Sequence, residues 1–421
     1  MTTPFQWDFN SDQPYQLKDR AFKKKKRSQQ WPSLLKTFMI SLFVLPLSLI
    51  AMPFVRPKKF NGSHFFAMGV NLDKNPQHTP ALIKELGVRT LIIRFPLWEM
   101  ARISEYLKFV QSFDSCTVTL NILQDREHIE DRELLEHDLK RIFESFQNDV
   151  ESFQIGSTIN RAKWGFFSVD EYLDFYETAY NLKKNHFPKL RLIGSNVIDF
   201  EFYFTAHTLF NLRKLRYDAL GSLLYVDRRG APENTQMGFN LSDKISLLAA
   251  MMRLSPKSDK HLYISETNWP ITGTAPYAPT SEKECVSEQE YAAYMLRYYL
   301  LAFASQQVER VYWHQLIAPG YGLIDNRDGQ LKKYSAFEAY AFMLKMLQDS
   351  QFLRLDIKRD YYILQAMRHE ELIQVHWALT PTTLNNEKAF DAFSLQGHLI
   401  EDDKLCISPD PIYLHIKEPL L

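Results

Sequence analysis

The sequence has few of the residues that build metal, disulfide and nucleotide sites. Among 421 residues there are only 3 cysteines, Cys116, Cys285 and Cys406, and none forms a C-x-x-C pair. So sparse and odd a set predicts neither a disulfide framework nor a zinc site. The sequence also lacks H-E-x-x-H, G-x-x-x-x-G-K-[ST] and G-x-S-x-G. These absences argue against zinc peptidases, P-loop nucleotide hydrolases and α/β-hydrolases, and we expect no metal and no cofactor.

Basic charge is scarce outside the N-terminal region. Residues 1–59 contain 11 Lys and Arg against 3 Asp and Glu, whereas the rest of the chain contains 39 against 47. A nucleic-acid-binding surface requires a basic stripe, and the long acidic remainder offers none. We therefore expect no nucleic-acid partner.

The N-terminal region has the pattern of a membrane anchor. The block "KKKKR" (23–27) precedes an uncharged apolar run of 19 residues, 37–55. At roughly 1.5 Å per residue, this run nearly matches a hydrocarbon core of about 30 Å. No A-x-A cleavage site follows it, which argues against a signal peptide. Because Lys and Arg are denser before the run than after it, we predict a basic cytoplasmic tail (1–36), one transmembrane helix (37–55), and the remainder in the periplasm or outside the cell.

Beyond the anchor, short apolar runs alternate with longer helical patterns. The predicted strands are 65–70, 89–95, 117–123, 152–156, 190–195, 217–225, 261–266 and 310–316. The predicted helices lie near 80–87, 98–112, 131–147, 168–187, 204–214, 241–254, 286–306 and 333–348. The seventh helix begins with a capping box, Ser287 three residues before Glu290. Eight strand–helix units indicate a parallel sheet.

The spacing of these units favours an α/β fold of the (β/α)8 TIM-barrel type over residues 60–349. A doubly wound sheet would more often have a glycine-rich phosphate turn after its first strand, and "VNLDKNPQ" contains no glycine. After residue 349 the pattern changes to short strands joined by polar turns, at 360–367, 371–379 and 410–416. We predict a small β-rich C-terminal appendage over 350–421.

Barrel enzymes place their chemistry at the C-terminal ends of the strands and in the loops that follow. In this sequence these positions are polar, of mixed charge and rich in tryptophan, which is typical of carbohydrate sites. The candidate substrate-binding residues are Arg94, Thr158, Asn160, Trp164, Asp199, Tyr225, Arg228, Arg229, Asn268, Trp269, Trp313 and His314.

These strand ends resemble those of clan A, the retaining glycoside hydrolases with an eightfold barrel. Glu266 in "YISETNWP" matches the clan's nucleophile at the end of strand seven, and Arg94 in "LIIRFP" matches the arginine that keeps it ionised. Trp313 in "VYWHQL" matches the tryptophan that often forms the floor of the sugar site, and Tyr225 matches the position of a residue that often bonds the nucleophile. The resemblance covers about residues 64–349 and implies a retaining glycosidase.

The chain departs from this clan at strand four. The clan's acid/base is the glutamate of "GNE-x-N", whereas this chain contains "FQIGSTINRAKWG", with Thr158 in that place. A threonine hydroxyl does not release a proton readily near neutral pH. Either another acid substitutes, or the site does not hydrolyse ordinary glycosides. The candidate substitutes are Asp199, Glu201, Asp227 and Glu233.

Among these candidates we favour Asp227 and Glu233, which share the loop "YVDRRGAPEN" after strand six. The adjacent Arg228 and Arg229 suggest an anionic group on the ligand, such as a uronate or a phosphorylated sugar. A solvated loop with local salt bridges accounts for the same residues.

Three functions follow from these patterns. The first is a membrane-anchored glycosidase or transglycosidase that acts on an envelope or extracellular polysaccharide, with Glu266 as nucleophile. The second is a catalytically attenuated barrel that binds carbohydrate or scaffolds polysaccharide assembly. The third is a barrel of unrelated chemistry, such as a lyase or metal-dependent hydrolase. The sequence argues against a metal-dependent enzyme, because His314 is the one histidine at the predicted strand ends and no ligand cluster accompanies it.

Overall fold

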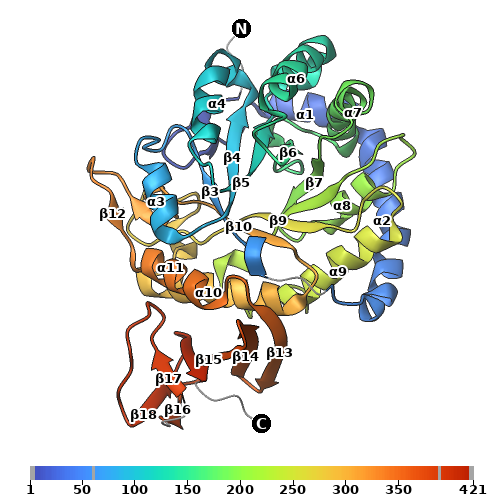
Figure 1. Ribbon diagram of the computed structural model, residues 1–421. Helices are drawn as coiled ribbons and strands as arrows, with labels where there is room; N and C mark the ends of the chain where they lie inside the picture. The colour runs from blue at the N-terminus through green and yellow to red at the C-terminus, as the bar shows by residue number, and fades with distance from the viewer. Residues whose placement is uncertain (1–4, 59–61, 387–389, 417–421) are drawn as a thin grey trace.

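The computed structural model describes residues 5–58, 62–386 and 390–416, without the side chain of Arg228. The predicted first residue of the barrel domain, residue 60, lies outside this part of the chain. Eight parallel strands form a closed barrel at the centre of the molecule (Figure 1). They are β3 (Phe66–Val70), β4 (Thr90–Pro96), β5 (Thr117–Leu123), β6 (Ser152–Ile155), β7 (Leu192–Ile198), β8 (Ala219–Leu223), β9 (Leu262–Thr267) and β10 (Arg310–Trp313).

The strands follow one another around the barrel in sequence order, and β10 pairs with β3 to close it. Both faces of each strand are covered, the inner face by the barrel interior and the outer face by helices, so nearly every strand residue is buried. The predicted (β/α)8 barrel is confirmed. Closure without an edge strand brings the C-terminal ends of all eight strands to one mouth.

Helices surround the barrel (Figure 1). They are α3 (Thr79–Leu86), α4 (Ile103–Gln111), α5 (Arg126–Glu130), α6 (Arg132–Phe146), α7 (Val169–His186), α8 (Phe202–Leu209), α9 (Leu241–Leu254), α10 (Glu288–Ser305) and α11 (Ser335–Leu347). The predicted capping box of α10 is present, because Ser287 accepts from the Glu290 backbone and the Glu290 side chain accepts in return.

The N-terminal segment forms a hairpin and two helices. Strands β1 (Trp7–Asp8) and β2 (Gln13–Pro14) pair antiparallel, and α1 (Arg20–Gln29) and α2 (Trp31–Ala51) follow. Helix α2 runs along the outside of the barrel beside α8 and α9 (Figure 1). It begins earlier than the predicted span because Pro32 lies in its first turn, where no amide donor is needed. With the 3₁₀ turn that follows it, this helix is long and apolar enough to cross a membrane.

The C-terminal appendage consists of antiparallel strands, as predicted. Five of them form one sheet in the order β13-β14-β15-β19-β17, and β16 pairs with β18. Their bounds are β13 (Gln351–Lys358), β14 (Tyr361–Arg368), β15 (Glu371–Ala378), β16 (Thr382–Asn385), β17 (Phe390–Phe393), β18 (Lys404–Ile407) and β19 (Ile412–Ile416). The appendage packs below α10 and α11 (Figure 1).

Glu233 lies at the junction between the barrel and this appendage. Its carboxylate accepts a hydrogen bond from Trp377 Nε1 in β15 at 2.9 Å and lies 3.4 Å from the guanidinium of Arg297 in α10. All three side chains are almost fully buried. This carboxylate compensates a buried arginine, and its contacts join the two parts of the molecule.

Candidate active site

A cavity of about 490 Å³ opens at the barrel mouth. Several of the predicted substrate-binding residues line it, together with Glu266. The full set of eight is Arg94, Thr158, Asn160, Trp164, Tyr225, Arg229, Asn268 and His314. The volume and the mixed polar and aromatic lining suit a small part of an oligosaccharide.

Glu266 lies at the centre of this cavity's polar network. It is the penultimate residue of β9, and its carboxylate receives a hydrogen bond from Tyr225 Oη at 2.6 Å and another from Arg94 Nη2 at 2.8 Å. Arg94 and Glu266 are each less than a tenth exposed. Arg94 in β4 and Tyr225, two residues after β8, therefore direct one cation and one hydroxyl at the same carboxylate.

This network favours the ionised form of Glu266. Burial alone would raise its pKa, but His314, Arg94 and the hydrogen bond from Tyr225 together lower it. Burial also lowers the pKa of His314 to about 4, so that imidazole is neutral near pH 7. The charge that keeps Glu266 ionised near neutral pH is therefore the guanidinium of Arg94.

The loop after β6, residues 156–168, contains no Asp or Glu. Thr158 is fully buried and has φ 52°, a left-handed conformation that β-branched residues rarely adopt. Asn160 donates to Glu201 at 2.7 Å, and Arg161 lies 2.6 Å from the same carboxylate. Glu201 lines the cavity as one half of an ion pair.

Lys163 is a titratable group of this loop that the sequence analysis did not single out. It lines the cavity, donates a hydrogen bond to Gln13, and has no ion pair within the described part of the chain. Burial, reinforced by the nearby Arg161, lowers its pKa to about 8. A lysine of this kind exchanges protons in the neutral to mildly alkaline range.

The remaining predicted site residues lie outside the cavity. Trp313 is fully buried, donates from Nε1 to Tyr291 Oη at 2.7 Å, and stacks on Trp269 at 5.9 Å. Trp269 in turn donates to the carbonyl of Arg229 at 2.8 Å. Asp199, Asp227 and Glu233 do not line the cavity, and the side chain of Arg228 is outside the described residues.

The N-terminal hairpin, residues 5–17, covers part of the mouth. Its Asp12 is 3% exposed, accepts from Gln315 at 2.8 Å and from Tyr321 Oη at 2.9 Å, and pairs with Lys74 at 3.1 Å. Arg94 also donates to the Asp12 carbonyl at 3.1 Å. The sequence predicts these residues as part of a tail, and no local pattern in it points to the cavity.

The hairpin also covers an aromatic platform at the edge of the mouth. Trp7 lies against Trp98, with ring centroids 5.2 Å apart, and against Trp164 at 5.6 Å. Aromatic faces of this kind are the surfaces on which sugar rings stack. Within the structure, the hairpin's own indole occupies that platform.

Cations outnumber carboxylates in the cavity lining. The three lining carboxylates are each paired: Asp12 with Lys74, Glu201 with Arg161 and Glu266 with Arg94. Four further lining cations have no ion pair among the described residues, namely Lys23, Arg27, Lys163 and Arg229. The guanidinium of Arg229 instead lies 3.6 Å from the ring centroid of Tyr225. The cavity therefore has a surplus of positive charge.

The described residues contain no group of three or more His, Cys, Asp or Glu side chains that could bind a metal ion.

We predict that Tyr225→Phe raises the pKa of Glu266, because the ionised carboxylate loses a hydrogen-bond donor. A carboxyl whose pKa is lowered by folding stabilises the fold above its unfolded value, 4.5, and that stabilisation is lost as the pH falls through the folded value. The free energy of unfolding of the variant should be lower by about 1.5–3 kcal/mol at pH 7. A carboxyl ¹³C titration and urea unfolding against pH measure both quantities.

The matched control is Tyr298→Phe, which removes a buried hydroxyl that donates to the Leu224 carbonyl at 2.6 Å. This control leaves the Glu266 titration unchanged. Equal titration curves for Tyr225→Phe and the unmodified protein would contradict the assigned role of Tyr225.

No protein-family model matches the chain, and no curated protein sequence is similar to it. Solved structures are similar in fold. A family 39 glycoside hydrolase from Bacteroides cellulosilyticus aligns over 86% of this chain and 83% of its own, with 14% identity and a TM-score of 0.63. A family 30 endoxylanase from Clostridium papyrosolvens aligns over 86% of this chain and 98% of its own, with 10% identity and a TM-score of 0.58.

A family 39 β-xylosidase from Caulobacter crescentus aligns over 86% of this chain and 98% of its own, with 12% identity and a TM-score of 0.56. These TM-scores show a shared fold, and the predicted resemblance is confirmed at the level of the fold. The chain has the eightfold barrel of the glycoside hydrolases of families 39 and 30 in clan A.

Proposed function

We propose that this protein is a membrane-attached glycoside hydrolase-like protein that acts on an envelope or extracellular polysaccharide, with Glu266 as nucleophile. The observation that supports this most is the contact of Glu266 with both Arg94 and Tyr225 at the barrel mouth. An ionised carboxylate at the base of a sugar-sized cavity is positioned to attack an anomeric carbon. The apolar helix α2 supplies the membrane attachment.

The proposed reaction has two steps. Glu266 attacks the anomeric carbon, forming a glycosyl ester while the glycosidic bond breaks, and the leaving oxygen takes a proton from the Lys163 ammonium. The neutral Lys163 amine then takes a proton from water, and the resulting hydroxide oxygen displaces Glu266. Lys163 is assigned this role because it lies in the strand-four loop that supplies the acid in clan A.

Glu266→Gln should remove turnover, by at least about 10³-fold, because an amide is a poor nucleophile. Incubation with a mechanism-based fluorosugar, followed by peptide mass spectrometry, should find the adduct on Glu266 in the unmodified protein alone. Glu233→Gln serves as the comparison for a carboxylate outside the cavity. Adduct formation elsewhere, or retained turnover in Glu266→Gln, would contradict the assignment.

Lys163→Gln tests the proton donor. Because the ammonium form is the acid, activity should fall as the pH rises past about 8, the pKa of Lys163. The variant should lose this alkaline limb, and its kcat/KM for alkyl glycosides should fall about 10²-fold. For dinitrophenyl glycosides, whose leaving group needs no proton, kcat/KM should stay nearly unchanged, whereas kcat should fall because the second step loses its base. An equal fall in kcat/KM for both substrates would assign proton donation to another group.

The surplus of cations in the cavity supports an anionic sugar as ligand. Lys23 and Arg27 lie one helical turn apart on α1 and both line the cavity, whereas the neighbouring Lys24 and Lys25 are exposed and do not. A carboxylate or phosphate on the sugar would satisfy the unpaired cations at the rim.

Lys23→Gln with Arg27→Gln should weaken binding of a uronic-acid oligosaccharide about tenfold or more, which corresponds to roughly 1.4 kcal/mol. Calorimetry on the full-length protein in detergent provides the measurement. The matched control, Lys24→Gln with Lys25→Gln, removes the same amount of charge and should leave that affinity unchanged. Similar losses in the two variants would mean that net charge, and not the cavity, attracts the ligand.

Thr158 favours a second candidate, a carbohydrate-binding barrel that has lost turnover. Thr158 stands in the strand-four loop where the resemblance to clan A implies an acid, and the neighbouring Glu201 forms an ion pair with Arg161. Under this alternative, oligosaccharide binding persists while neither azide nor formate rescues hydrolysis of activated glycosides. Turnover that depends on Glu266 excludes it.

A further inference from the structure

Three contacts place the N-terminal segment and the barrel on the same side of any membrane. The hairpin contacts the cavity through Asp12, and Gln13 donates to the Pro279 carbonyl at 2.9 Å. Lys26 in α1 pairs with Glu130 at the end of α5. A bilayer between the N-terminal tail and the barrel, as the sequence pattern predicts, would separate all these contacts.

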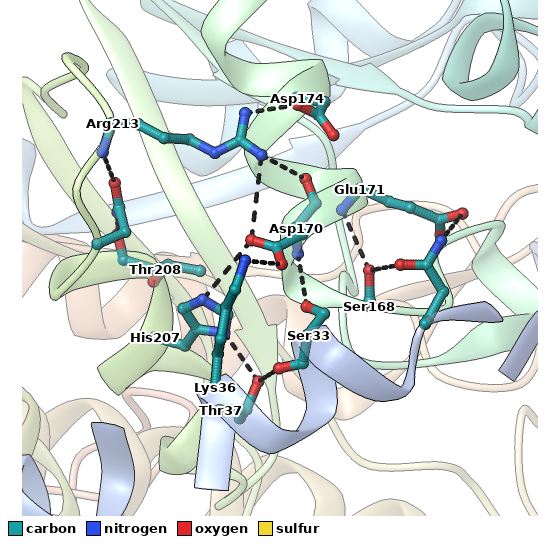
Figure 2. Close-up of polar contacts among 12 residues, drawn as sticks. Ser33, Lys36, Thr37, Ser168, Asp170, Glu171, Asp174, His207, Thr208 and Arg213 are labelled. Carbon is teal, nitrogen blue, oxygen red and sulfur yellow. Dashed lines mark hydrogen bonds and ion pairs between the residues drawn. The ribbon is translucent and has the colours of Figure 1, made fainter. Parts of the chain in front are cut away.

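Helix α2 contacts the barrel through a narrow polar stripe. Its buried residues are Ser33, Thr37, Ser41, Val44 and Ser48, which are three or four positions apart and therefore share one face. Figure 2 shows this contact at the N-terminal half of α2, where Thr37 Oγ1 lies 2.8 Å from His207 Nδ1 and the Asp170 amide donates to Ser33 Oγ at 3.2 Å. The polar face of the helix is thus directed at the protein.

A charged network next to this stripe is incompatible with a docked helix that spans a bilayer. Lys36 of α2 pairs with Asp170 of α7 at 2.9 Å, and Arg213 contacts Asp174 and, at 3.0 Å, Glu177 of the same helix α7. Figure 2 shows Lys36, Asp170, Arg213 and Asp174. Charged side chains are costly in the hydrocarbon core. With α2 docked, the bilayer centre cannot lie at this level of the barrel.

The outward face of α2 is apolar. Phe38, Phe43 and Ile50 are 62%, 62% and 68% exposed, and Leu34, Leu42 and Leu47 lie on the same outward surface. A contiguous apolar surface of this kind is rare on soluble proteins and marks a membrane or protein contact. Basic residues flank it: Lys24 and Lys25 before the helix and Arg56 after it are exposed and, among the described residues, have no ion pair.

From these contacts we infer that α2 lies in the plane of an anionic lipid bilayer surface, docked on the barrel, with its apolar face in the acyl boundary and its flanking basic residues among the headgroups. Such helices enter the interface to a depth of about 5–10 Å. Basic residues beside the helix favour anionic over zwitterionic headgroups. The inference rests on the proposed membrane attachment and not on the carbohydrate chemistry, so the two are tested separately.

The depth of α2 is measured with nitroxide labels on Leu35→Cys, Leu42→Cys and Leu49→Cys, each in the full-length protein with Cys116, Cys285 and Cys406 replaced by serine. These exposed positions are seven residues apart, so they share one side of the helix, and the first and last are about 21 Å apart along it. In vesicles of phosphatidylcholine and phosphatidylglycerol, an in-plane helix gives three equal shallow depths. A depth maximum at residue 42 would show a span and overturn the inference. Ser41→Cys, which faces the barrel, is the control for a site hidden from lipid.

Lipid charge and sidedness provide two further measurements. Lys24→Gln and Lys25→Gln should each lower affinity for the mixed vesicles about fivefold and leave affinity for pure phosphatidylcholine vesicles unchanged. An impermeant maleimide should label Lys25→Cys and the exposed native Cys406 from the same side of the membrane. Labelling from opposite sides, or affinity that is insensitive to both lysines, would overturn the inference.

Discussion

The contact between Arg94 and Glu266 is the constraint on which the rest of the site depends. A carboxylate this deeply buried would favour its protonated form without a partner, and the guanidinium 2.8 Å away keeps it ionised. The two residues are 172 positions apart in the chain, and only closure of the barrel brings β4 and β9 to one mouth. Burial of the pair is in turn completed by the hairpin, whose Asp12 carbonyl accepts from Arg94.

Strand periodicity in the sequence was sufficient to predict the barrel, and the resemblance of the strand ends to clan A singled out Glu266, Arg94 and Tyr225, which lie in contact. It was insufficient for side-chain direction. Trp313 also ends a strand, yet its indole lies in the layer between β10 and α10, where Tyr291 Oη accepts a hydrogen bond from it. Glu233 was equally ambiguous, since its partners Trp377 and Arg297 come from elements far along the chain.

The N-terminal hairpin was beyond prediction for a similar reason. Two short strands, one tryptophan and one aspartate form no periodic pattern, and their contacts with Trp164 and Tyr321 are set by tertiary packing alone. Hydropathy predicts a span for the adjoining apolar helix, but it does not distinguish a helix with one lipid-facing surface from a helix surrounded by lipid. The stripe of serine and threonine on α2 becomes informative only when His207 and Asp170 are seen against it.

The basic block "KKKKR" connects the two proposals. Because α1 is helical, Lys23 and Arg27 fall on one face, at the cavity, while Lys24 and Lys25 face solvent. Lys26 is committed to Glu130, so the five charges are divided among three neighbours. Under the two proposals, this one short helix would present cations to an anionic glycan on one side and to anionic headgroups on another. Because α1 both lines the cavity and leads into α2, a barrel docked in this way would have its cavity close to the lipid surface.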